Sequence, residues 1–443
     1  MLRPLFLLLG LAPLLLVAQR ATPRVQLDRL VADNPVFASG HTGFSLYDLA
    51  TEQTVYSYQA DRYFVPASNV KLLTFYVAHR ILDRSLPAIY YRRQADRVDI
   101  WGTGYPLLLH PAFYGYDELA PWLARQQLPI VVQQPENDTP PRYGAGWSWD
   151  DFDYGYVYER SGLPIYGNRL YLDLDETVTP VADALLGAPP EVARSIVQDA
   201  RQERTIRRAE ETNSFTVNES IYDRRNFPLQ RALRTSAAFT LRQLQQAFPD
   251  QTISGGRQPR PTLTDLSAHR VAFPDTLYRR LLQDSDNYLA EQLILQSAAA
   301  RYGTFDESTL FDYATDTLFA GIGLGRLRFA DGSGLSRYNL VTPNQFVQVL
   351  AALDREVGRE RLLSLLPTGG KTGTLKRRFD GAAEPYVWAK TGSLSGVLCV
   401  SGLLRTRSGR WLAFSFLHNN VMGRTSDYYR EMERALGWVY ESL

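Results

Sequence analysis

The sequence predicts an α/β protein in which one domain, built from both ends of the chain, is interrupted by a mostly β insertion. Alternating apolar residues near both ends indicate strands, and residues 266–365 have a mainly helical pattern. Between them, short strand-like runs are separated by Pro- and Gly-rich turns. With 443 residues the chain is too long for one ordinary core. We expect the divided domain at 22–85 and 266–443, and the insertion at 86–265.

The N-terminus, "MLRPLFLLLGLAPLLLVAQRATP", has the order of a secretory signal. Arg3 supplies a positive charge, residues 4–17 form an apolar run, and Ala18 is a small residue suited to cleavage. This predicts a signal peptide over 1–21 and a periplasmic mature protein. The alternative is a retained N-terminal anchor, which would give a peripheral membrane association, although the run is short for a spanning helix.

The elements of the divided domain follow in order. "HTGFSLYDLATEQTVYSY" (41–58) alternates on both sides of a polar turn and predicts a hairpin. "PASNVKLLTFYVAHRIL" (66–82) has apolar residues at helical spacing just after a proline, and predicts a helix. Near the C-terminus, "YVWAK", "VLCVSGLL" and "WLAFSFLH" predict strands, and a final helix is expected from about 425.

Within 86–265, four runs predict the strands of the insertion: "RVDIWG", "PIVVQQ", "RLYLDLD" and "SFTVN". The aromatic cluster of residues 147–158 could be a sugar-stacking platform, but packing of the insertion against the divided domain is the favoured interpretation. The arginines of residues 201–208 are expected to form a solvated face.

Composition excludes several classes of function. The formal net charge of +1 gives no case for nucleic-acid binding. Cys399 is the single cysteine, so neither an intramolecular disulfide nor a cysteine-based metal site can form. The five histidines are scattered, with no pair at helical ligand spacing. The sequence therefore predicts no metal site and no cofactor.

Lysine usage points to particular positions. Of 48 basic Lys and Arg residues, only Lys71, Lys371, Lys376 and Lys390 are lysines. Lysine can lose its proton when it is buried or crowded by another cation, whereas arginine practically cannot. A chain that uses arginine almost everywhere has a specific reason for each lysine that it keeps.

Ser68 and Lys71 are one helical turn apart and predict a nucleophile with its base. They share one face, and the N-terminus of a helix offers backbone N–H groups to an oxyanion. Alternatively, Ser68 is only an N-cap and Lys71 a solvated charge. A second motif, Ser285-Asp286-Asn287, lies between two helical patterns, where it could also be a cap.

The tripeptide Lys-Thr-Gly occurs twice. Lys390 follows the apolar run "YVWA" and precedes the alternating "SLSGVLCVSGLL", so it is expected on a rigid strand that borders a cleft. Lys371 lies in turn-rich sequence and is expected in an exposed loop. The motifs S-x-x-K, S-D-N and K-T-G, in this order, are the signature of β-lactamases and penicillin-binding proteins.

With these motifs, "DGSGLSRYNLVTP" (331–343), "LPTGGKTGTLKRRF" (366–379) and "GWSWDDFDYGYVYERSGLPIYGN" (146–168) resemble the D-alanyl-D-alanine carboxypeptidase/endopeptidase branch of the penicillin-binding proteins, low-molecular-mass class C. The resemblance covers almost the whole mature chain, and Lys371 is its one noted departure. It implies a β-lactamase/transpeptidase-like domain with an antiparallel sheet and helices. It also implies peptidoglycan peptides as substrates and β-lactams as inhibitors.

The resemblance implies a role for each motif residue. Ser68 attacks the carbonyl between the two D-alanines, and Lys71, kept neutral partly by the charge of Lys390, takes its proton. Ser285 relays a proton to the leaving amine, while Asn287 orients Lys71 and the substrate amide. The expected substrate-binding residues, together with Lys390, are Thr391, Gly392 and Ser393, and the N–H groups of Ser68 and Ser393 form the oxyanion hole.

Two other functions compete with this interpretation. A serine β-lactamase or esterase on the same fold would turn penicillin over rapidly, where a carboxypeptidase would stay acylated. A catalytically silent scaffold for cell-wall peptides would have no need of the base Lys71.

Overall fold

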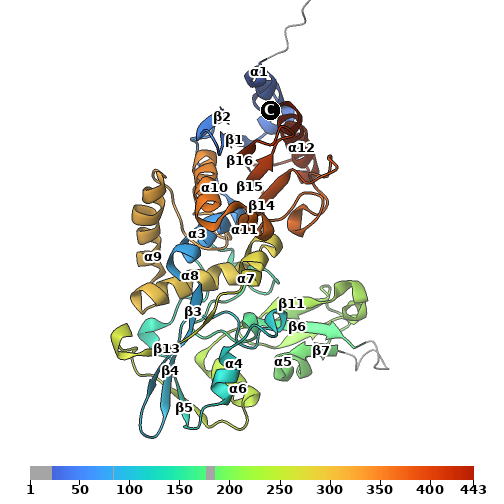
Figure 1. The fold of residues 1–443 in the computed structure, drawn as a ribbon. Coiled ribbons are helices and arrows are strands. Elements are labelled where there is room, and N and C mark those ends of the chain that lie inside the picture. Colours follow the sequence, from blue (N-terminus) through green and yellow to red (C-terminus); the bar gives the residue numbers. More distant parts are fainter. Residues whose placement is uncertain (1–21, 83, 176–184) are drawn as a thin grey trace, which may run out of the picture.

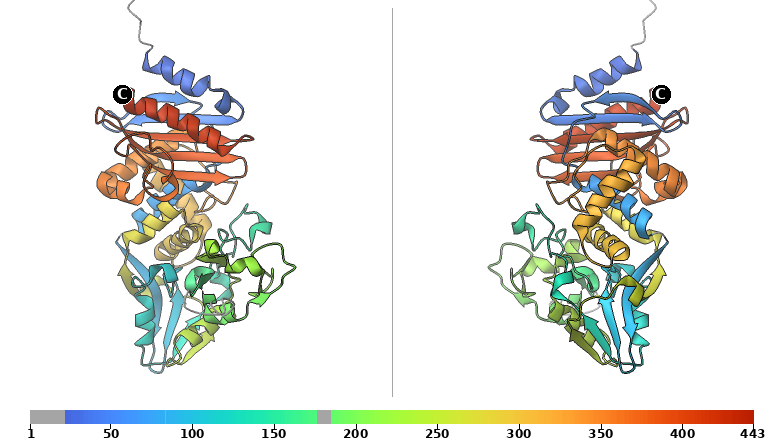
Figure 2. Two further views of the ribbon diagram at one scale, coloured as in Figure 1. Left: turned by 90° about the vertical axis from the view of Figure 1, so that its right-hand side faces the viewer. Right: turned by 90° about the vertical axis from the view of Figure 1, so that its left-hand side faces the viewer.

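The computed structural model describes residues 22–82, 84–175 and 185–443. The molecule is elongated, with the C-terminal strands at one end and the middle of the chain at the other (Figures 1 and 2). The predicted signal peptide, or anchor, lies outside the described residues. Within those described ranges, no helix has the length and apolar character needed to cross a membrane.

Both ends of the chain form one antiparallel sheet, in the order β14-β15-β16-β1-β2. Its strands are β1 (His41–Asp48), β2 (Gln53–Tyr58), β14 (Val387–Leu394), β15 (Val397–Arg405) and β16 (Trp411–Asn419). The hairpin and the three C-terminal strands predicted from alternation are thus confirmed. Blue and red strands lie side by side in Figure 1 because residues far apart in the sequence share this sheet.

Helices cover both faces of this sheet. Phe414 and Phe416 of β16 pack into the cluster that contains the C-terminal helix, whereas Ala413 and Leu417 pack into the larger core on the other face. This alternation follows from the two-residue period of a strand. The outer layer consists of α1 (Pro23–Leu27), η1 (Asp28–Ala32), α2 (Pro35–Ala38) and α12 (Thr425–Ser442), and α12 confirms the predicted final helix.

The inner layer carries the helices that lead to the cleft. They are α3 (Lys71–Leu82), α7 (Asp275–Arg279), α8 (Asn287–Tyr302), α9 (Glu307–Tyr313), α10 (Pro343–Val357) and α11 (Arg359–Leu365). α8 is buried on all sides between Tyr288 and Ala299. It lies between the sheet and the middle segment of the chain in Figure 1, so whatever begins α8 is held from both sides.

The middle of the chain forms three further sheets. The largest has the order β12-β5-β4-β3-β13, and the smaller ones the orders β11-β6-β7 and β8-β10-β9. Their strands are β3 (Ser85–Arg93), β4 (Val98–Gly102), β5 (Ile130–Gln133), β6 (Arg169–Leu174), β7 (Leu185–Ala188), β8 (Val197–Gln198), β9 (Ile206–Arg208), β10 (Phe215–Val217), β11 (Leu229–Ala232), β12 (Ile253–Gly256) and β13 (Ser267–Ala272). All four predicted strand runs of this region are strands. The predicted division of the chain at 86 and 265 stays a proposal: β3 begins at Ser85, and its antiparallel partner β13 lies beyond residue 265.

The insertion also contains helices that the sequence pattern did not indicate: α4 (Leu119–Ala124), α5 (Pro190–Arg194) and α6 (Ala237–Ala247). The shorter turns of helix in the chain are η2 (Ala67–Val70), η3 (Pro111–Phe113), η4 (Glu136–Asp138), η5 (Trp149–Asp151), η6 (Tyr166–Asn168), η8 (Glu219–Tyr222), η9 (Arg224–Asn226), η10 (Leu263–Asp265), η11 (Arg280–Asp284), η12 (Ala314–Phe319), η13 (Ala320–Ile322) and η14 (Gly373–Leu375).

Two expectations for the insertion need correction. Arg201 is solvated, but the Arg208 residue is 0% exposed and donates to the carbonyls of Ala209 and Phe152, so residues 201–208 are not a uniform solvated face. The aromatic cluster is also divided. Tyr158 is buried, as packing would require, whereas Trp149 is 79% exposed.

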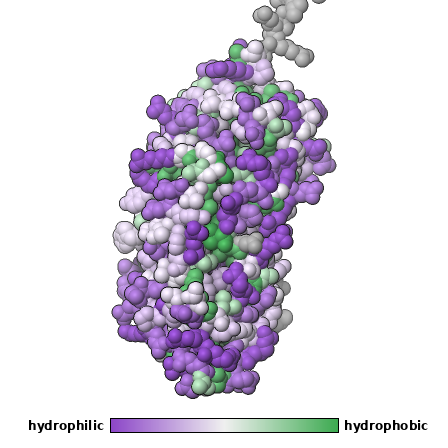
Figure 3. Space-filling view, turned by 60° about the vertical axis from the view of Figure 1, so that its left-hand side comes forward, coloured by the Kyte–Doolittle hydropathy of each residue, from purple (hydrophilic) through white to green (hydrophobic). Residues whose placement is uncertain are grey.

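The surface in Figure 3 is predominantly hydrophilic, with apolar residues gathered in a narrow band along the long axis. Extended apolar patches mark docking or membrane-contact sites. Among the described residues of this face, apolar colour does not spread into such a broad patch. A candidate functional site is therefore expected in a cleft or pocket rather than on an exposed apolar surface.

Candidate active site

A cleft of about 540 Å³ lies where the divided domain meets the insertion. Its wall includes residues from the predicted motifs, Ser68, Ser285, Asn287 and Ser393, and residues 146–151 of the insertion. The sequence-predicted residues that were 217 positions apart (285 − 68) thus face one space.

Ser68 lies in η2, immediately before α3. The predicted helix therefore begins with a turn of 3-10 helix, and its α-helical part starts only at Lys71. Ser68 and Lys71 still share a face, and Lys71 Nζ lies 3.0 Å from Ser68 Oγ. The preceding residue, Ala67, has a φ of 46°, which is unusual for a residue with a side chain. Such strain is maintained only where the surrounding structure enforces it, and it often accompanies functional sites.

Lys71 is fully buried and has two further acceptors. Its Nζ donates to Asn287 Oδ1 at 2.6 Å and to the carbonyl of Ser333 at 2.5 Å. Burial lowers the pKa of Lys71 to about 8, while the carboxylates of Asp331 and Glu291 act in the opposite direction. A lysine with such a pKa can take a proton near neutral pH.

Lys390 and Ser285 form the second pair. Lys390 lies on β14, as predicted, and its Nζ donates to Ser285 Oγ at 2.9 Å and to the carbonyl of Thr391 at 2.7 Å. Ser285 follows η11 with a left-handed φ of 58°, in the connection between two helices that the sequence predicted. Burial, and then the charge of Lys71, hold the pKa of Lys390 well below its ordinary value.

Burial is the largest cause of the lowered pKa of Lys71. Burial, followed by the like charge of Lys71, also lowers the pKa of Lys390, and because repulsion between two like charges is mutual it favours the neutral form of either lysine. Among the described residues Lys390 Nζ has a hydroxyl and a carbonyl acceptor but no carboxylate, so its site is suited to an incoming carboxylate.

Gly392 lets β14 approach the nucleophile. A Cβ at this position would lie 2.6 Å from the carbonyl oxygen of Pro66 and 3.0 Å from the backbone nitrogen of Asn69. Any side chain would therefore push the strand away from η2. Ser68 and Ser393, which follow or precede these closely approaching backbones, both line the cleft, where two N–H donors to one oxyanion would have to lie.

The first Lys-Thr-Gly copy does not line the cleft, but its loop contacts a residue of the second copy. The Lys371 side chain is 57% exposed, in agreement with the predicted loop. Three residues further on, Thr374 hydroxyl lies 2.8 Å from the hydroxyl of Thr391. The loop thus positions Thr391, a function that was not expected from its sequence.

Sequence reasoning missed two buried carboxylates beneath the lysine. Glu291 Oε1 accepts from the Ser333 backbone N–H at 2.7 Å, and Ser333 is the residue whose carbonyl accepts from Lys71. Asp331 accepts from the backbone N–H of Gly334 at 2.9 Å and from Trp147 Nε1 at 2.8 Å. Glu291 gave no signal in the sequence beyond its place in an apolar helix, whereas Asp331 begins a quoted family segment.

The insertion also supports the S-D-N motif directly. Arg169 of β6 forms two hydrogen bonds of 3.1 Å to the carboxylate of Asp286, and both side chains are nearly buried. Asp286 in turn caps α8 by accepting from Leu289 N–H. Asn287 Nδ2 donates to the carbonyl of Tyr156 at 2.8 Å. These contacts fix the turn that carries Ser285.

A serine–lysine pair at a helix start, a second serine–lysine pair between a helix turn and a strand, and a three-layer domain define the class of penicillin-binding proteins and serine β-lactamases. The chain belongs to the D-Ala-D-Ala carboxypeptidase 3 (S13) family, whose model matches residues 24–87 and 138–437. The predicted family, fold class and type of enzyme are thereby confirmed.

Curated relatives carry the corresponding names. The chain is 28% identical to the D-alanyl-D-alanine carboxypeptidase of an Actinomadura species, over 94% of this chain and 85% of the relative. It is 26% identical to the D-alanyl-D-alanine carboxypeptidase DacB of Haemophilus influenzae, over 66% of this chain and 64% of that relative. The matched region thus spans less than two thirds of the Haemophilus protein.

A solved structure shows the same fold. The crystal structure of penicillin binding protein 4 from Haemophilus influenzae superposes with a TM-score of 0.70 at 21% identity, and covers 94% of this chain and 99% of that one. A second structure of that protein, in complex with a β-lactam, superposes with a TM-score of 0.66.

Proposed function

We propose that this protein is a penicillin-sensitive D-Ala-D-Ala carboxypeptidase and endopeptidase that acts through a Ser68 acyl-enzyme. One observation carries the proposal. Lys71 is buried, its Nζ donates to three acceptors and lies 3.0 Å from Ser68 Oγ, and its pKa is lowered to about 8. A silent binding scaffold would have no use for this arrangement. The family membership favours the carboxypeptidase over the β-lactamase alternative.

Acylation follows from the geometry. Lys71 Nζ takes the proton of Ser68 as Oγ attacks the carbonyl carbon between the two D-alanines. The backbone N–H groups of Ser68 and Ser393 stabilise the oxyanion, each contributing on the order of 3 kcal/mol. When the C–N bond breaks, Ser285 gives its proton to the departing amine and regains one from Lys71, which is thereby neutral again. Water then attacks the ester carbonyl while Lys71 accepts a proton from it, and Lys71 returns this proton to Ser68 Oγ as the ester C–O bond breaks.

Recognition is assigned to the second lysine. The terminal carboxylate of the substrate meets Lys390 and the hydroxyl of Thr391, with the N–H of Gly392 nearby on the same strand. A bound carboxylate raises the pKa of Lys390 because it supplies the missing counter-ion. Lys390 then carries a full charge beside Lys71, which favours the neutral form of Lys71 when substrate is present.

The endopeptidase part rests on the leaving group. Stem peptides release D-alanine, whereas cross-linked dimers release the side-chain amine of a diamino acid, and both reactions break the same type of amide bond. The cleft has a volume of about 540 Å³, and several residues of the insertion between 146 and 157 line it. A cleft of this size has space for the larger leaving group.

The proposed substrates place the protein outside the cytoplasm, in the periplasm. A signal peptide over residues 1–21 would deliver it there, and the retained-anchor alternative would add a peripheral membrane association. Peptidoglycan peptides are the proposed partners, and β-lactams the proposed inhibitors.

The test combines intact mass with product analysis. After incubation with penicillin, the wild type should gain one adduct on the peptide that contains Ser68, and Ser68→Ala should gain none. An adduct that persists in the variant would contradict the assignment. Chromatography of digested cell-wall fragments should show both released D-alanine and cleaved dimers. Rapid penicillin hydrolysis with neither peptide product would instead support a β-lactamase.

A further inference from the structure

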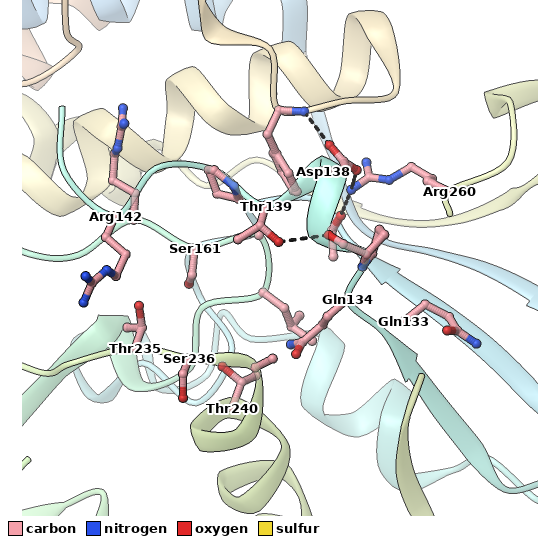
Figure 4. Close-up of a pocket in the computed structure, with 18 residues that line it drawn as sticks. Gln133, Gln134, Asp138, Thr139, Arg142, Ser161, Thr235, Ser236, Thr240 and Arg260 are labelled. Atoms are coloured by element: carbon pink, nitrogen blue, oxygen red, sulfur yellow. Dashed lines mark hydrogen bonds and ion pairs between the residues drawn. The ribbon is translucent and has the colours of Figure 1, made fainter. Parts of the chain in front are cut away.

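A second hollow region lies in the insertion, around the first turn of α6. Its central part, about 270 Å³, is shown in Figure 4. A hollow of about 680 Å³ shares Arg142, Thr235 and Ser236 with it. A third hollow, of about 250 Å³, shares Gln134 and Ala237 with the central part. These three neighbouring hollows have wall residues in common, and we call them together the α6 groove.

The groove wall contains buried polar groups that lack partners. The Arg260 side chain is 4% exposed, and its Nε and Nη1 form no hydrogen bond within the described part of the chain. Thr240, which also lines the groove, is 4% exposed. Native proteins leave few buried polar groups unsatisfied. A buried arginine with two unsatisfied N–H groups in this wall indicates that a polar ligand completes it.

Charge decides the class of ligand. Arg260 Nη2 lies 2.8 Å from Asp138 Oδ2, and Arg142 Nη1 lies 3.5 Å from Glu159 Oε1. The third arginine of the wall, Arg160, is paired with two glutamates of α8 and α9. Since every arginine has its own carboxylate, the groove has little excess positive charge. A neutral ligand is therefore favoured over an anion.

The remaining wall offers two kinds of contact. Hydroxyl and amide groups come from Ser161, Thr240 and Gln134, several of which are labelled in Figure 4. Apolar surface comes from Leu163 and Phe305. An N-acetylated amino sugar matches this mixture, because it has many hydroxyl groups, an amide, an apolar ring face and a methyl group.

The groove and the catalytic cleft are close in the fold. Residues 138–142 and 160–163 line the groove, while residues 146–157 of the same segment line the cleft. Arg160 Nη1 also lies 3.3 Å from Glu291, which holds the Ser333 backbone beside Lys71. A polymer in the groove would therefore present its side branches near the cleft.

On these grounds we propose that the α6 groove binds the glycan strand of peptidoglycan, a linear chain of N-acetylated amino sugars. This inference rests on the proposed function, since the stem peptides that enter the cleft are attached to such strands. The groove would hold the polymer while Ser68 acts on its peptides.

Three variants test the groove. Ala237→Trp fills it from an exposed position shared by two hollows, and Thr240→Val removes a hydroxyl of the groove wall at nearly constant size. Ala320→Trp is the matched control, an exposed alanine of η13 in the divided domain. The probe is peptide-free glycan strands prepared from cell walls, with binding measured by titration calorimetry. Melting temperatures report whether each variant is folded.

We expect Ala237→Trp to weaken glycan binding at least 10-fold, and Thr240→Val roughly 2- to 10-fold, the range for one hydrogen bond. Ala320→Trp should bind like the wild type. In hydrolysis assays, Ala237→Trp should lower the ratio of D-alanine released from intact cell walls to that released from a small soluble peptide. Unchanged glycan binding by a folded Ala237→Trp would overturn the inference, as would a wild type that binds free stem peptides but no glycan.

The assays separate this inference from the proposed function. Hydrolysis of the small soluble peptide by the wild type tests the function alone. Calorimetry with peptide-free strands involves no catalysis, and so it tests the groove alone.

Discussion

At the scale of single residues, the two lysines of the cleft differ in what surrounds them. Lys71 has three acceptors, and buried carboxylates lie behind one of them. Lys390 has a hydroxyl and a carbonyl, and the charge of Lys71 lowers its pKa further. The nearby carboxylates raise the pKa of Lys71 against the effect of burial, so this lysine can take up and release a proton near neutral pH. The charged form of Lys390 would be stabilised by an anion that binds beside it. In the proposed mechanism the same residue type thus serves as base at one position and as carboxylate receptor at the other.

Replacing Lys71 by Arg should test the base. Arginine keeps the positive charge but cannot accept a proton, so acylation by penicillin should fall about 10²- to 10⁴-fold, the usual range for loss of a general base. The second-order rate of labelling by a fluorescent penicillin measures this. Labelling close to that of the wild type would reduce Lys71 to an electrostatic partner of Ser68.

The acylation rate should depend on pH with one limb set by Lys71. Only its neutral form can accept a proton, so with a pKa of about 8 the rate should rise with pH below 8 and level off above it. Glu291 raises the pKa of Lys71, and its own pKa is raised to about 7 by burial and by Asp331. It is therefore largely ionised where Lys71 titrates, and Glu291→Gln should move the limb to lower pH.

The control is Glu307→Gln, because Glu307 pairs with the same Arg160 but is absent from the causes of the Lys71 shift. Its pH limb should stay at the wild-type position. If both variants shift the limb equally, the effect passes through Arg160 rather than through the charge of Glu291.

Substitutions in the two Lys-Thr-Gly copies should affect acylation very differently. Lys390→Ala should lose carboxylate recognition and reduce acylation by penicillin at least 100-fold, because an unpaired substrate carboxylate would have to be buried. Lys371→Ala should stay within a few-fold of the wild type, since Lys371 is exposed and its nearest carboxylate, Glu384, is 3.9 Å away. Rates of penicillin labelling compare the two. A crippled Lys371 variant would reverse the assignment of the motif.

At the scale of elements, the active site is a contact between β14 and η2. Gly392 makes this contact possible, since a Cβ there would meet the backbone of Pro66 and Asn69. Gly392→Ala should therefore reduce acylation about 100-fold, the cost of displacing reacting groups by roughly 1 Å. Gly381→Ala is the control, because a Cβ at Gly381 meets nothing within 4 Å. Near-wild-type acylation by Gly392→Ala would show that strand position is not critical.

The elements that the sequence predicted best are those with strong periodicity and a local partner. β14 and β15 are consecutive, both alternate, and Lys390 pairs with Ser401 across the hairpin. α6 escaped prediction because its buried positions include Thr240 and Gln243, which blur an apolar stripe. Residues whose role depends on long-range contacts were also missed: Glu291 reads as one polar residue in a buried helix, although it lies under Ser333.

The motif residues themselves could be predicted because each motif consists of residues that are close together in the sequence. Ser68 and Lys71 share a face in either a 3-10 or an α-helical turn, so the error in the helix start did not matter. The cause of the Lys71 pKa shift was not predictable, because its burial depends on α8 and on the segment around Ser333, which contact Lys71 from distant parts of the chain.

At the scale of the whole molecule, the insertion is part of the active site rather than an appendage. Trp147 donates a hydrogen bond to Asp331, the carbonyl of Tyr156 accepts a hydrogen bond from Asn287, and Arg169 forms an ion pair with Asp286. The hydrophobic core is also continuous between the two regions, since residues of β3, β4 and β5 belong to the same cluster as those of α3 and α8. Substitutions in the insertion should therefore alter the position of the turn that carries Ser285.

The buried pair of Arg169 and Asp286 tests this coupling. Arg169 also lies over the Tyr158 ring at 4.0 Å. Burial is the largest single influence on the pKa of Asp286 and raises it, but the charge and hydrogen bonds of Arg169, together with the N–H of Leu289, lower this pKa below its ordinary value. Breaking a buried pair on one side leaves an uncompensated charge, at about 3–5 kcal/mol. Arg169→Met and Asp286→Asn should each lower the melting temperature and slow acylation, because the turn that holds Ser285 loses its anchor.

The double variant decides whether the pair or each residue alone matters. Asparagine caps helices as well as aspartate does, so Asp286→Asn keeps the cap of α8. With both charges removed, no unpaired ion remains, and a buried pair replaced by neutral groups is often nearly neutral in stability. The double variant should therefore melt closer to the wild type than either single variant does, at one scan rate. Strictly additive losses would mean that Arg169 acts through its packing on Tyr158, and not through the charge of Asp286.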